Sequence, residues 1–251
     1  MHSIEPATRV AIVIPALNEA LAIRAVVESA LAQCADVFVI DDGSSDDSTA
    51  RIADLPVQLI RHSARMGKGR SLKDGMQAAF AAGFDAVISI DGDGQHSGED
   101  VPRLLRAHTL QPRVLLVCAR LIGRESQPVL RRFANHFADF WVSWACGQRV
   151  LDSQCGQRLY PRLIMETIET PVADGFAFES EVLINAAQAG FVIAALPIRA
   201  RYHAGRRDSH FQPLRDVVKI TRVIFWKIVF RGLALPSLFR SRSRPAVQLE
   251  P

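Results

Sequence analysis

Two aspartates separated by one glycine, Asp91 and Asp93, directly follow an apolar run at residues 86–90. The run has the length and the β-branched residues of a buried strand. Residues two apart on an extended chain point the same way, so the two carboxylates should converge where the strand ends. Converging carboxylates repel each other unless a cation lies between them, and Mg²⁺ and Mn²⁺ prefer oxygen ligands. The pattern predicts a divalent metal ion that holds the diphosphate of a bound nucleotide.

An Asp-Gly-Asp sequence also occurs in solvated turns and in calcium-binding loops. When the sequence is isolated, a solvated turn is its commoner setting. A calcium loop of the EF-hand type requires glycine at its sixth position, where this chain has His96, so such a loop is excluded. The buried strand before the aspartates and the polar clusters at other strand ends favour the metal site over the turn.

Similar polar clusters follow other predicted strands. Strands are predicted at residues 9–14, 37–40, 57–60 and 86–90, with helices at 20–33 and 68–82 between them. This alternation predicts a mostly parallel sheet. In open sheets of this kind, ligands bind beyond the carboxyl ends of the strands. We therefore expect the polar residues at 15–19, 41–46 and 91–96 to form one binding site.

Two common nucleotide-binding motifs are absent. Residues 67–71 look like part of a phosphate-binding P-loop, but the first glycine would fall at His62, and Gly69 replaces the required Ser or Thr. The glycine fingerprint of dinucleotide-binding proteins should lie in the first strand-to-helix turn, where this chain has residues 15–19. A kinase-like or NAD-binding site is therefore disfavoured.

The charge of the chain is unevenly distributed. Residues 199–244 hold twelve Arg and Lys against Asp208 and Asp216, a balance of +10, so the other residues carry −6 of the net +4. An acidic body with a basic C-terminal segment suits an anionic partner: nucleic acid, phosphorylated lipid or a membrane surface. The length of 251 residues fits one large α/β domain or two small ones.

The sequence also indicates in which cellular compartment the protein works. The four cysteines have no paired spacing, which indicates reduced thiols in a cytosolic setting. The N-terminus has no signal-peptide pattern, and no stretch reaches the roughly 20 apolar residues needed to span a bilayer. We expect a cytoplasmic protein that meets the membrane as a peripheral protein.

The motifs of one family occur at residues 14–19, 39–46, 67–69, 91–96 and 152–156. On these stretches the chain resembles the inverting glycosyltransferases of family 2, in particular those that transfer sugars to dolichyl and other polyprenyl phosphates. The resemblance covers residues 9–212 and implies an α/β fold of the GT-A type, with a mostly parallel central sheet flanked by helices. The implied division is a catalytic domain at residues 1–212 and a basic amphipathic helix and tail at 213–251.

The resemblance also assigns the donor site. It implies that the nucleotide is bound by Pro15, Ala16, Asn18, Glu19, Asp42, Lys68 and Asp91. Asp91, Asp93 and Gln95 would bind Mg²⁺ or Mn²⁺, which stabilises the leaving diphosphate. Two of these acids could also have simpler structural roles, since Glu19 could lie in the first turn of a helix and Asp42 could be a turn residue.

On the acceptor side, the resemblance places Asp152 beside the anomeric carbon, and Asp152 and Asp93 are the expected catalytic residues. Asp174 and Glu179 are alternative bases for a hydroxyl acceptor, whereas a lipid phosphate is already ionised. The residues expected to contact the acceptor or its phosphate are Arg131, Arg132, Glu181, Arg206 and Arg207. Residues 205–211 depart from the Arg-x-x-Gly-x-Ser-Lys pattern common in polyprenyl-phosphate enzymes, which leaves the acceptor open.

Two helices expected in the second half carry large apolar faces. The helix opened by Arg131 has an aromatic stripe, for which packing against the core is favoured over contact with lipid: Phe133, Phe137, Phe140, Trp141 and Trp144. The helix expected at residues 214–231 is too charged to span a bilayer and too apolar to stand free in water. We expect it to lie in the membrane interface; packing against the core or a second copy of the chain is the alternative.

These features predict a metal-dependent enzyme that transfers a sugar, with inversion, from a nucleoside-diphosphate sugar to a lipid acceptor on the inner face of the cytoplasmic membrane. Polyprenyl phosphate is the preferred acceptor, and a hydroxyl of an envelope lipid or glycan is the alternative. A nucleotidyltransferase would need a glycine-rich loop where residues 15–19 lie. A nucleic-acid-binding protein would leave Asp91 and Asp93 unexplained, so no nucleic acid partner is expected. The sugar, the base and homo-oligomer formation stay open.

Overall fold

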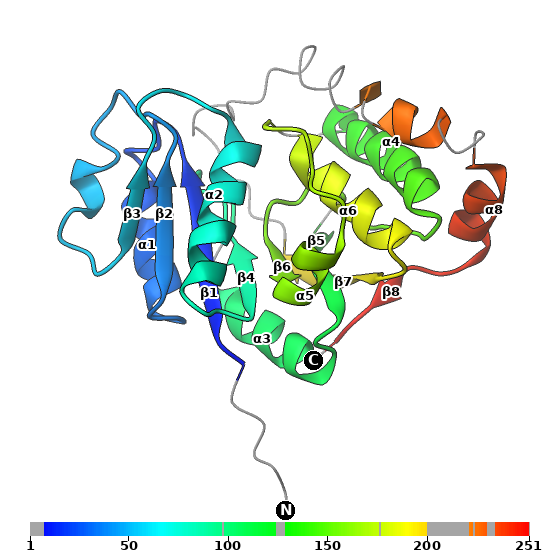
Figure 1. Cartoon of the computed structure of the whole chain (residues 1–251), viewed down its shortest axis with the longest axis horizontal. Helices are drawn as coiled ribbons and strands as arrows, with labels where there is room; N and C mark the ends of the chain where they lie inside the picture. Colours follow the sequence, from blue (N-terminus) through cyan, green and yellow to red (C-terminus); the bar gives the residue numbers. More distant parts are fainter. Residues whose placement is uncertain are drawn as a thin grey trace, which may run out of the picture.

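The apolar runs of the sequence form the strands of one central sheet (Figure 1). The computed structural model describes residues 8–96, 98–123, 129–175, 177–199, 221–222, 224–229 and 234–250. The strands are β1 Val10–Ala16, β2 Val37–Asp41, β3 Gln58–Arg61, β4 Ala86–Ser89, β5 Val114–Ile122, β6 Arg158–Pro161, β7 Val192–Arg199 and β8 Val247–Gln248. Within the described residues these eight strands lie in the order β3-β2-β1-β4-β6-β5-β7-β8.

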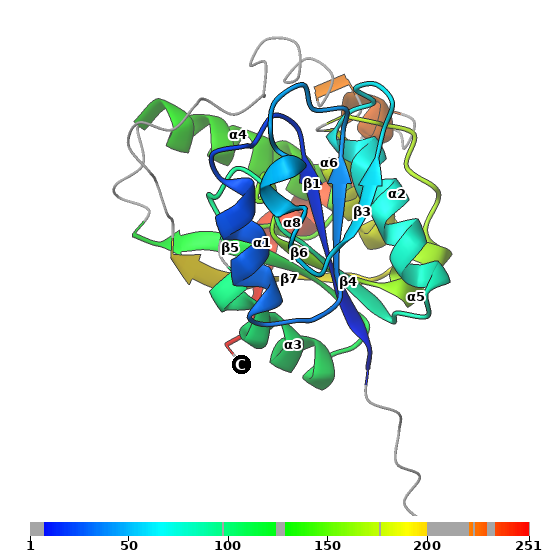
Figure 2. The ribbon, with the colours of Figure 1, turned by 90° about the vertical axis from the view of Figure 1, so that its left-hand side faces the viewer.

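Strands β3, β2, β1 and β4 are parallel and form one half of the sheet. β1 and β2 are buried along nearly their whole length because helices cover both faces, which is why their sequences are apolar throughout. Figure 2 shows helix α1 (Ile23–Leu31) and helix α2 (Lys68–Ala81) on opposite sides of these strands. The expected parallel arrangement is confirmed here, although β1 continues beyond the expected end to Ala16.

The other half of the sheet contains a reversal of strand direction. β6 runs antiparallel to both of its neighbours, β4 and β5, whereas β5, β7 and β8 run parallel to one another. The sequence pattern predicts neither the four-residue strand β6 nor the two-residue strand β8. The sheet is therefore mostly parallel, as expected, with an antiparallel strand inserted between its two parallel parts.

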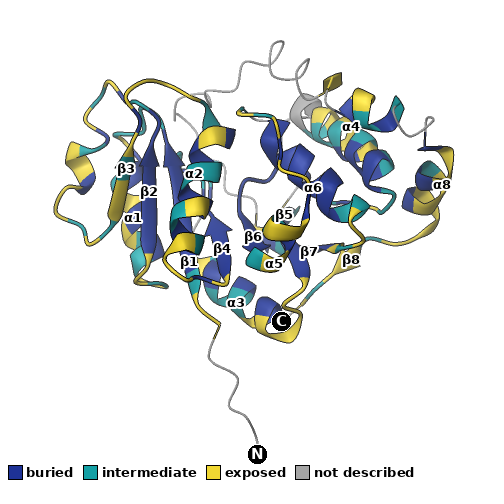
Figure 3. Ribbon diagram, in the orientation of Figure 1, coloured by how far each residue is buried: buried dark blue, intermediate teal, exposed yellow. Residues whose placement is uncertain are grey.

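The remaining helices are α3 Val101–Leu110, α4 Val129–Cys146, α5 Arg162–Thr167, α6 Ala177–Gln188 and α8 Leu235–Ser243, with short 3₁₀ helices at Ala50–Ile52 and Gly98–Asp100. α6 is buried along most of its length, because it contacts α4 on one side and β7 on another (Figure 3). Across the described residues, no helix combines the length and the apolar character that a membrane-spanning helix requires.

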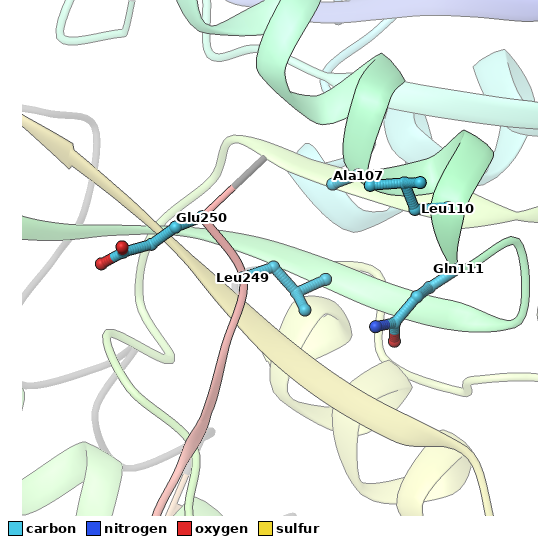
Figure 4. Close-up of a pocket in the computed structure, with 5 residues that line it drawn as sticks. All are labelled: Ala107, Leu110, Gln111, Leu249 and Glu250. Atoms are coloured by element: carbon cyan, nitrogen blue, oxygen red, sulfur yellow. The ribbon is translucent and has the colours of Figure 1, made fainter.

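The C-terminal segment returns to the domain. The backbone N–H of Leu249 donates to the carbonyl of Ala195 at 2.9 Å, so β8 extends the edge at β7. Figure 4 shows Leu249 at a small pocket that Ala107 and Leu110 of α3 also line. Ile224 and Ile228, each 3% exposed, belong to the hydrophobic core. The described C-terminal residues thus pack against the domain, and the boundary between a catalytic domain and a separate tail stays a prediction.

Candidate active site

Asp91 and Asp93 lie just after β4, at the edge of the sheet where the parallel strands end. The backbone N–H of Gln95 donates to Asp93 Oδ1 at 2.9 Å, which fixes the turn that carries the three expected metal ligands. A Cβ at Gly156 would overlap with the Asp91 carboxylate, so the loop before β6 can approach Asp91 only because residue 156 is glycine. The structure therefore brings together the motifs at residues 91–96 and 152–156.

Lys68, the first residue of α2, forms ion pairs with two acids. Its Nζ lies 2.7 Å from Asp91 Oδ1 and 2.9 Å from Oε2 of Glu179, a residue of α6. Burial lowers the pKa of Lys68, but the charges of Asp91 and Glu179 outweigh burial and raise the pKa above its ordinary value. Lys68 is therefore an ammonium ion in this site, and Glu179 is one of its two counter-ions.

The two aspartates influence each other's protonation. Burial raises the pKa of Asp93, and the negative charge of Asp91 raises it further. Burial also acts to raise the pKa of Asp91, but the charge of Lys68 contributes to holding it below its ordinary value. A dication between the carboxylates would remove their repulsion, so the pair fits Mg²⁺ or Mn²⁺. In the described part of the chain, no three acidic, histidine or cysteine side chains gather as a metal site, so other ligands would come from the donor diphosphate and water.

A buried histidine–cysteine pair lies beside Asp91. Nε2 of His96 is 3.2 Å from Sγ of Cys155, and Nδ1 of His96 is 3.8 Å from Oδ2 of Asp91. Burial lowers the pKa of His96 to about 4, so the imidazole is neutral at physiological pH. Burial raises the pKa of Cys155 to about 12, so this residue stays a thiol. The pair packs against the site as neutral groups and supplies no thiolate nucleophile.

Asn18 joins the first polar cluster to the second. Its backbone is left-handed, with φ 53°, and its Oδ1 accepts a hydrogen bond from the backbone N–H of Ser45 at 2.8 Å. In return, Ser44 Oγ accepts from the Asn18 N–H at 2.9 Å, and Ser48 Oγ accepts from the Glu19 N–H at 2.7 Å. Asn18 and Glu19 are thus fixed to the loop after β2, which gives this part of the expected donor site a defined shape.

Three other residues assigned to the nucleotide are buried at the same edge of the sheet. Pro15 and Ala16 belong to the end of β1, where they pair with β2 instead of forming a loop. Oδ2 of Asp42 accepts a hydrogen bond from the backbone N–H of Gly67 at 2.8 Å. Gly67 has φ 105°, a conformation that favours glycine, and it directly precedes Lys68. Asp42 therefore positions the start of α2, while nucleotide binding by these residues stays a prediction.

A buried ion pair between Arg120 and Asp152 lies on another side of the site. Nε and Nη2 of Arg120 donate to the two carboxylate oxygens of Asp152, each at 2.7 Å. Asp152 has φ 51°, and the carboxylate of Asp139 on α4 accepts from the backbone N–H groups of Asp152 and Ser153. The expected base is thus bound on both oxygens by a guanidinium that the motifs did not single out. An arginine near the end of the long buried strand β5 is the signal that could have identified it.

The residues expected on the acceptor side are placed unevenly. Arg132 is half-buried on α4. Outside the described residues lie the side chain of Arg131 and the whole of Arg206 and Arg207. Glu181 is buried in α6, where its Oε2 accepts from the backbone N–H groups of Val172 and Ala173 at 3.0 Å each. The contacts found for Glu181 hold the loop before α6, and its role toward an acceptor stays a prediction.

The site therefore combines the carboxylates of Asp91 and Asp93 with two cations, the half-buried Lys68 and the buried Arg120. The charge of Arg120 also helps to lower the pKa of Asp91, so its guanidinium lies within electrostatic reach of the carboxylates. Carboxylates of this kind bind a dication, and arginine and lysine bind phosphate oxygens. The arrangement suits a substrate that carries phosphate groups.

Comparison with known proteins identifies the family. The family model described as Glycosyl transferase family 2 matches residues 11–186. The chain belongs to this family and is a glycosyltransferase, as its motifs indicated.

Relatives and solved structures agree with this assignment. The polyprenol monophosphomannose synthase of Mycolicibacterium smegmatis is 24% identical over 208 residues, which cover 78% of this chain and 78% of the relative. The UDP-N-acetylglucosamine–dolichyl-phosphate N-acetylglucosaminyltransferase of Methanococcus voltae is 24% identical over 213 residues, or 76% of this chain and 85% of the relative. A structure of glucosyl-3-phosphoglycerate synthase from Mycobacterium tuberculosis with Mn²⁺, UDP and phosphoglyceric acid is similar with a TM-score of 0.64 and 24% identity, covering 89% of this chain and 78% of that chain. The expected GT-A fold is confirmed.

Proposed function

We propose that this glycosyltransferase moves a sugar from a nucleoside-diphosphate sugar to a polyprenyl phosphate, with Mg²⁺ or Mn²⁺ bound at Asp91 and Asp93. The observation that carries this proposal is the pair of half-buried carboxylates after β4, with the Lys68 ammonium 2.7 Å from Asp91. It is supported by relatives that are named for polyprenol and dolichyl phosphate, and by a structural neighbour that holds Mn²⁺ and UDP.

The donor end of the site follows from its charges. Asp91, Asp93 and Gln95 would hold the metal ion, which when bound offsets the charge of the departing diphosphate. Lys68 adds a second positive charge, because two carboxylates keep it protonated at this position. The loops joined by Asn18 lie on the same edge of the sheet and would hold the nucleoside.

The acceptor end of the site suits an acceptor that carries a negative charge. Inversion requires the acceptor oxygen to attack the anomeric carbon from the side opposite the diphosphate, so that one C–O bond forms as the other breaks. A phosphate oxygen is already ionised, so no base has to remove a proton. Arg120 would donate N–H groups to this phosphate while Asp152 holds the guanidinium in place, which makes Asp152 a positioning residue. A hydroxyl acceptor would instead require Asp152 to release Arg120 and accept a proton.

This chemistry also suggests where the enzyme works. A polyprenyl phosphate is anchored in a bilayer, so the acceptor end of the site has to face a membrane surface. We place the protein on the inner face of the cytoplasmic membrane as a peripheral protein. The basic C-terminal segment, with a balance of +10 over residues 199–244, supports contact with anionic lipids.

A transfer assay with defined lipids tests the proposal. The purified protein would be incubated with UDP-, GDP- and dTDP-sugars, Mn²⁺ or Mg²⁺, and detergent-dispersed undecaprenyl phosphate, and the lipids analysed by mass spectrometry. We expect a product heavier by one sugar residue that requires the metal ion. Unphosphorylated undecaprenol is the matched control acceptor. Undiminished transfer in excess chelator, or equal transfer to undecaprenol, would contradict the proposed metal or acceptor respectively.

A further inference from the structure

Helix α4 presents phenylalanine side chains to solvent. Phe133, Phe137 and Phe140 are 67%, 49% and 40% exposed, and their spacing of four and three residues places them on one face of the helix. The opposite face, with Val142 and Ala145, is buried in the core. The sequence predicts that the whole aromatic stripe of this helix packs against the core. This prediction is wrong for the three phenylalanines, which are exposed. An exposed row of aromatic rings indicates a surface that another body covers.

Helix α8 lies against α4 and also has exposed apolar side chains. The indole N–H of Trp144 on α4 donates to the carbonyl of Ala234, the residue before α8, at 3.3 Å. Leu235 and Phe239 on α8 are 51% and 73% exposed. Figure 1 shows α8 beside the end of α4, and Figure 3 shows exposed residues on both helices. We call this surface the aromatic face; its members are Phe133, Phe137, Phe140, Leu235 and Phe239.

The exposed charges on the described residues of α4 and α8 have one sign. Arg240, Arg242 and Arg244 are exposed on and after α8. The single acid of α4 is Asp139, which is buried and binds the loop at Asp152. No Asp or Glu occurs anywhere between residues 217 and 249. Aromatic rings fringed by arginine, with no exposed acid on these helices, complement an anionic lipid surface better than a protein surface of mixed charge.

The helical residues 224–229 contribute to the same side of the molecule but are fixed to the domain. Nζ of Lys227 lies 3.0 Å from Oε2 of Glu169 and 2.9 Å from Oδ1 of Asn185. Ile224 and Ile228 are buried in the core. Lys227 is therefore paired with residues of the domain itself, whereas the expected interfacial helix would have its basic side chains free for lipid headgroups. Residues 214–220 of that expected helix lie outside the described residues.

The aromatic face also has a structural connection to the active site. Asp139, on the inner side of α4, holds the loop that carries Asp152, and Asp152 binds Arg120. The same helix therefore presents phenyl rings outward and supports the Arg120–Asp152 pair inward.

We propose that the aromatic face docks onto an anionic bilayer surface, with the phenyl rings of α4 and α8 in the interfacial region and Arg240, Arg242 and Arg244 at the headgroups. This inference rests on the proposed function only in assigning the acceptor to the membrane. Because α4 and α8 are packed elements of the domain, docking fixes the orientation of the active site instead of merely tethering it. Phenylalanine and arginine divide these two roles, since rings partition into the interface and guanidinium groups bind lipid phosphates.

Vesicle sedimentation tests the docking. The full-length protein would be mixed with vesicles of phosphatidylglycerol and phosphatidylcholine that contain no polyprenyl phosphate, so the result does not depend on the transfer reaction. We expect the triple variant Phe133→Ser/Phe137→Ser/Phe140→Ser to partition on the order of a hundredfold less than the unaltered protein. The matched control is Leu110→Ser, which removes a 74% exposed side chain from α3. Thermal unfolding checks that both variants stay folded, since Phe137 and Phe140 also contact the rings of Trp141 and Trp144.

Three results would overturn the inference. The first is unchanged sedimentation of the triple variant, and the second is equal binding of the unaltered protein to vesicles of pure phosphatidylcholine. The third is a concentration-dependent dimer that the triple variant abolishes without a loss of vesicle binding, because a second copy would then cover the aromatic face. Vesicle binding that persists while the transfer assay fails would refute the proposed function and leave this docking intact.

Discussion

The two aspartates after β4 are held differently, although both have the same side chain. Asp91 is paired with Lys68 and is backed by His96 at 3.8 Å. Asp93 has a raised pKa because it is buried beside the charge of Asp91. Loss of the charge at Asp93 should therefore relieve repulsion in the protein without metal and remove a proposed ligand from the protein with metal. The two effects can be measured separately.

Asp93→Asn should lower the turnover number roughly a hundredfold or more, because the departing diphosphate loses part of its charge stabilisation. The free energy of unfolding should stay the same or rise slightly without metal, because repulsion of Asp91 is removed. Initial rates at saturating Mn²⁺ and urea unfolding measure the two quantities. Asp36→Asn, at an exposed aspartate before β2, is the control. A full rate in Asp93→Asn would disprove the metal role.

Asp152→Asn should lower turnover far more than it raises the KM for the donor, because Asp152 orients Arg120 on the acceptor side. The substitution also leaves a buried guanidinium without its counter-ion, which costs about 3–5 kcal/mol of stability. The double variant Arg120→Gln/Asp152→Asn should be less destabilised than the sum of the single variants, as measured by chemical denaturation. An equal loss of donor affinity would move Asp152 to the donor site.

At the scale of elements, the loop between Asp152 and β6 sets the position of Asp91. Gly156→Ala would place a Cβ against the Asp91 carboxylate, so it should weaken metal-dependent binding of a nucleoside diphosphate about tenfold and cost roughly 1–3 kcal/mol of stability. Calorimetric titration measures the binding. Gly175→Ala is the matched control, because a Cβ there meets no atom within 4 Å. Equal binding by the two variants would show that the loop can shift away.

At the scale of the whole molecule, the C-terminal residues close one edge of the sheet. Removal of residues 246–251 eliminates β8 and the packing of Leu249 against the hydrophobic core. We expect the free energy of unfolding to fall by roughly 1–3 kcal/mol, mostly from lost apolar burial, in a urea titration. Removal of residues 250–251 alone keeps Leu249 and is the control. If both truncated proteins unfold at the same urea concentration, the tail adds no stability.

The same packing limits what a larger deletion can establish. Removal of residues 214–251 would take Ile224 and Ile228 out of the core, so a loss of membrane binding could follow from a damaged domain. Substitution of exposed side chains on α4 avoids this ambiguity. Membrane binding and stability are therefore best separated on the aromatic face, where the side chains lie outside the core.

The sequence alone was sufficient for the position of Asp91 and Asp93 at a strand end, the parallel strands and the family. These features are local, because a strand covered on both faces must be a short apolar run, and its carboxyl end must carry the polar residues. Asp91 and Asp93 follow such a run directly, so their convergence could be inferred from the spacing. The motif between Asp152 and Gly156 was recognised for the same reason, since its residues are close in the chain.

Only the tertiary structure decided which partners these residues have. Arg120 and Asp152 are 32 residues apart and meet because β5 and the loop before β6 are neighbours in the sheet. Lys68 on α2 forms ion pairs with Asp91, which follows β4, and with Glu179 on α6. The periodicity of the sequence does not predict these pairs. The exposure of Phe133 depends on which face of α4 packs inward, and an amphipathic pattern with aromatic residues on both faces does not determine this. The spacing of residues along the chain determines which way neighbouring side chains point. The pairing of strands across the sheet determines which distant residues come into contact.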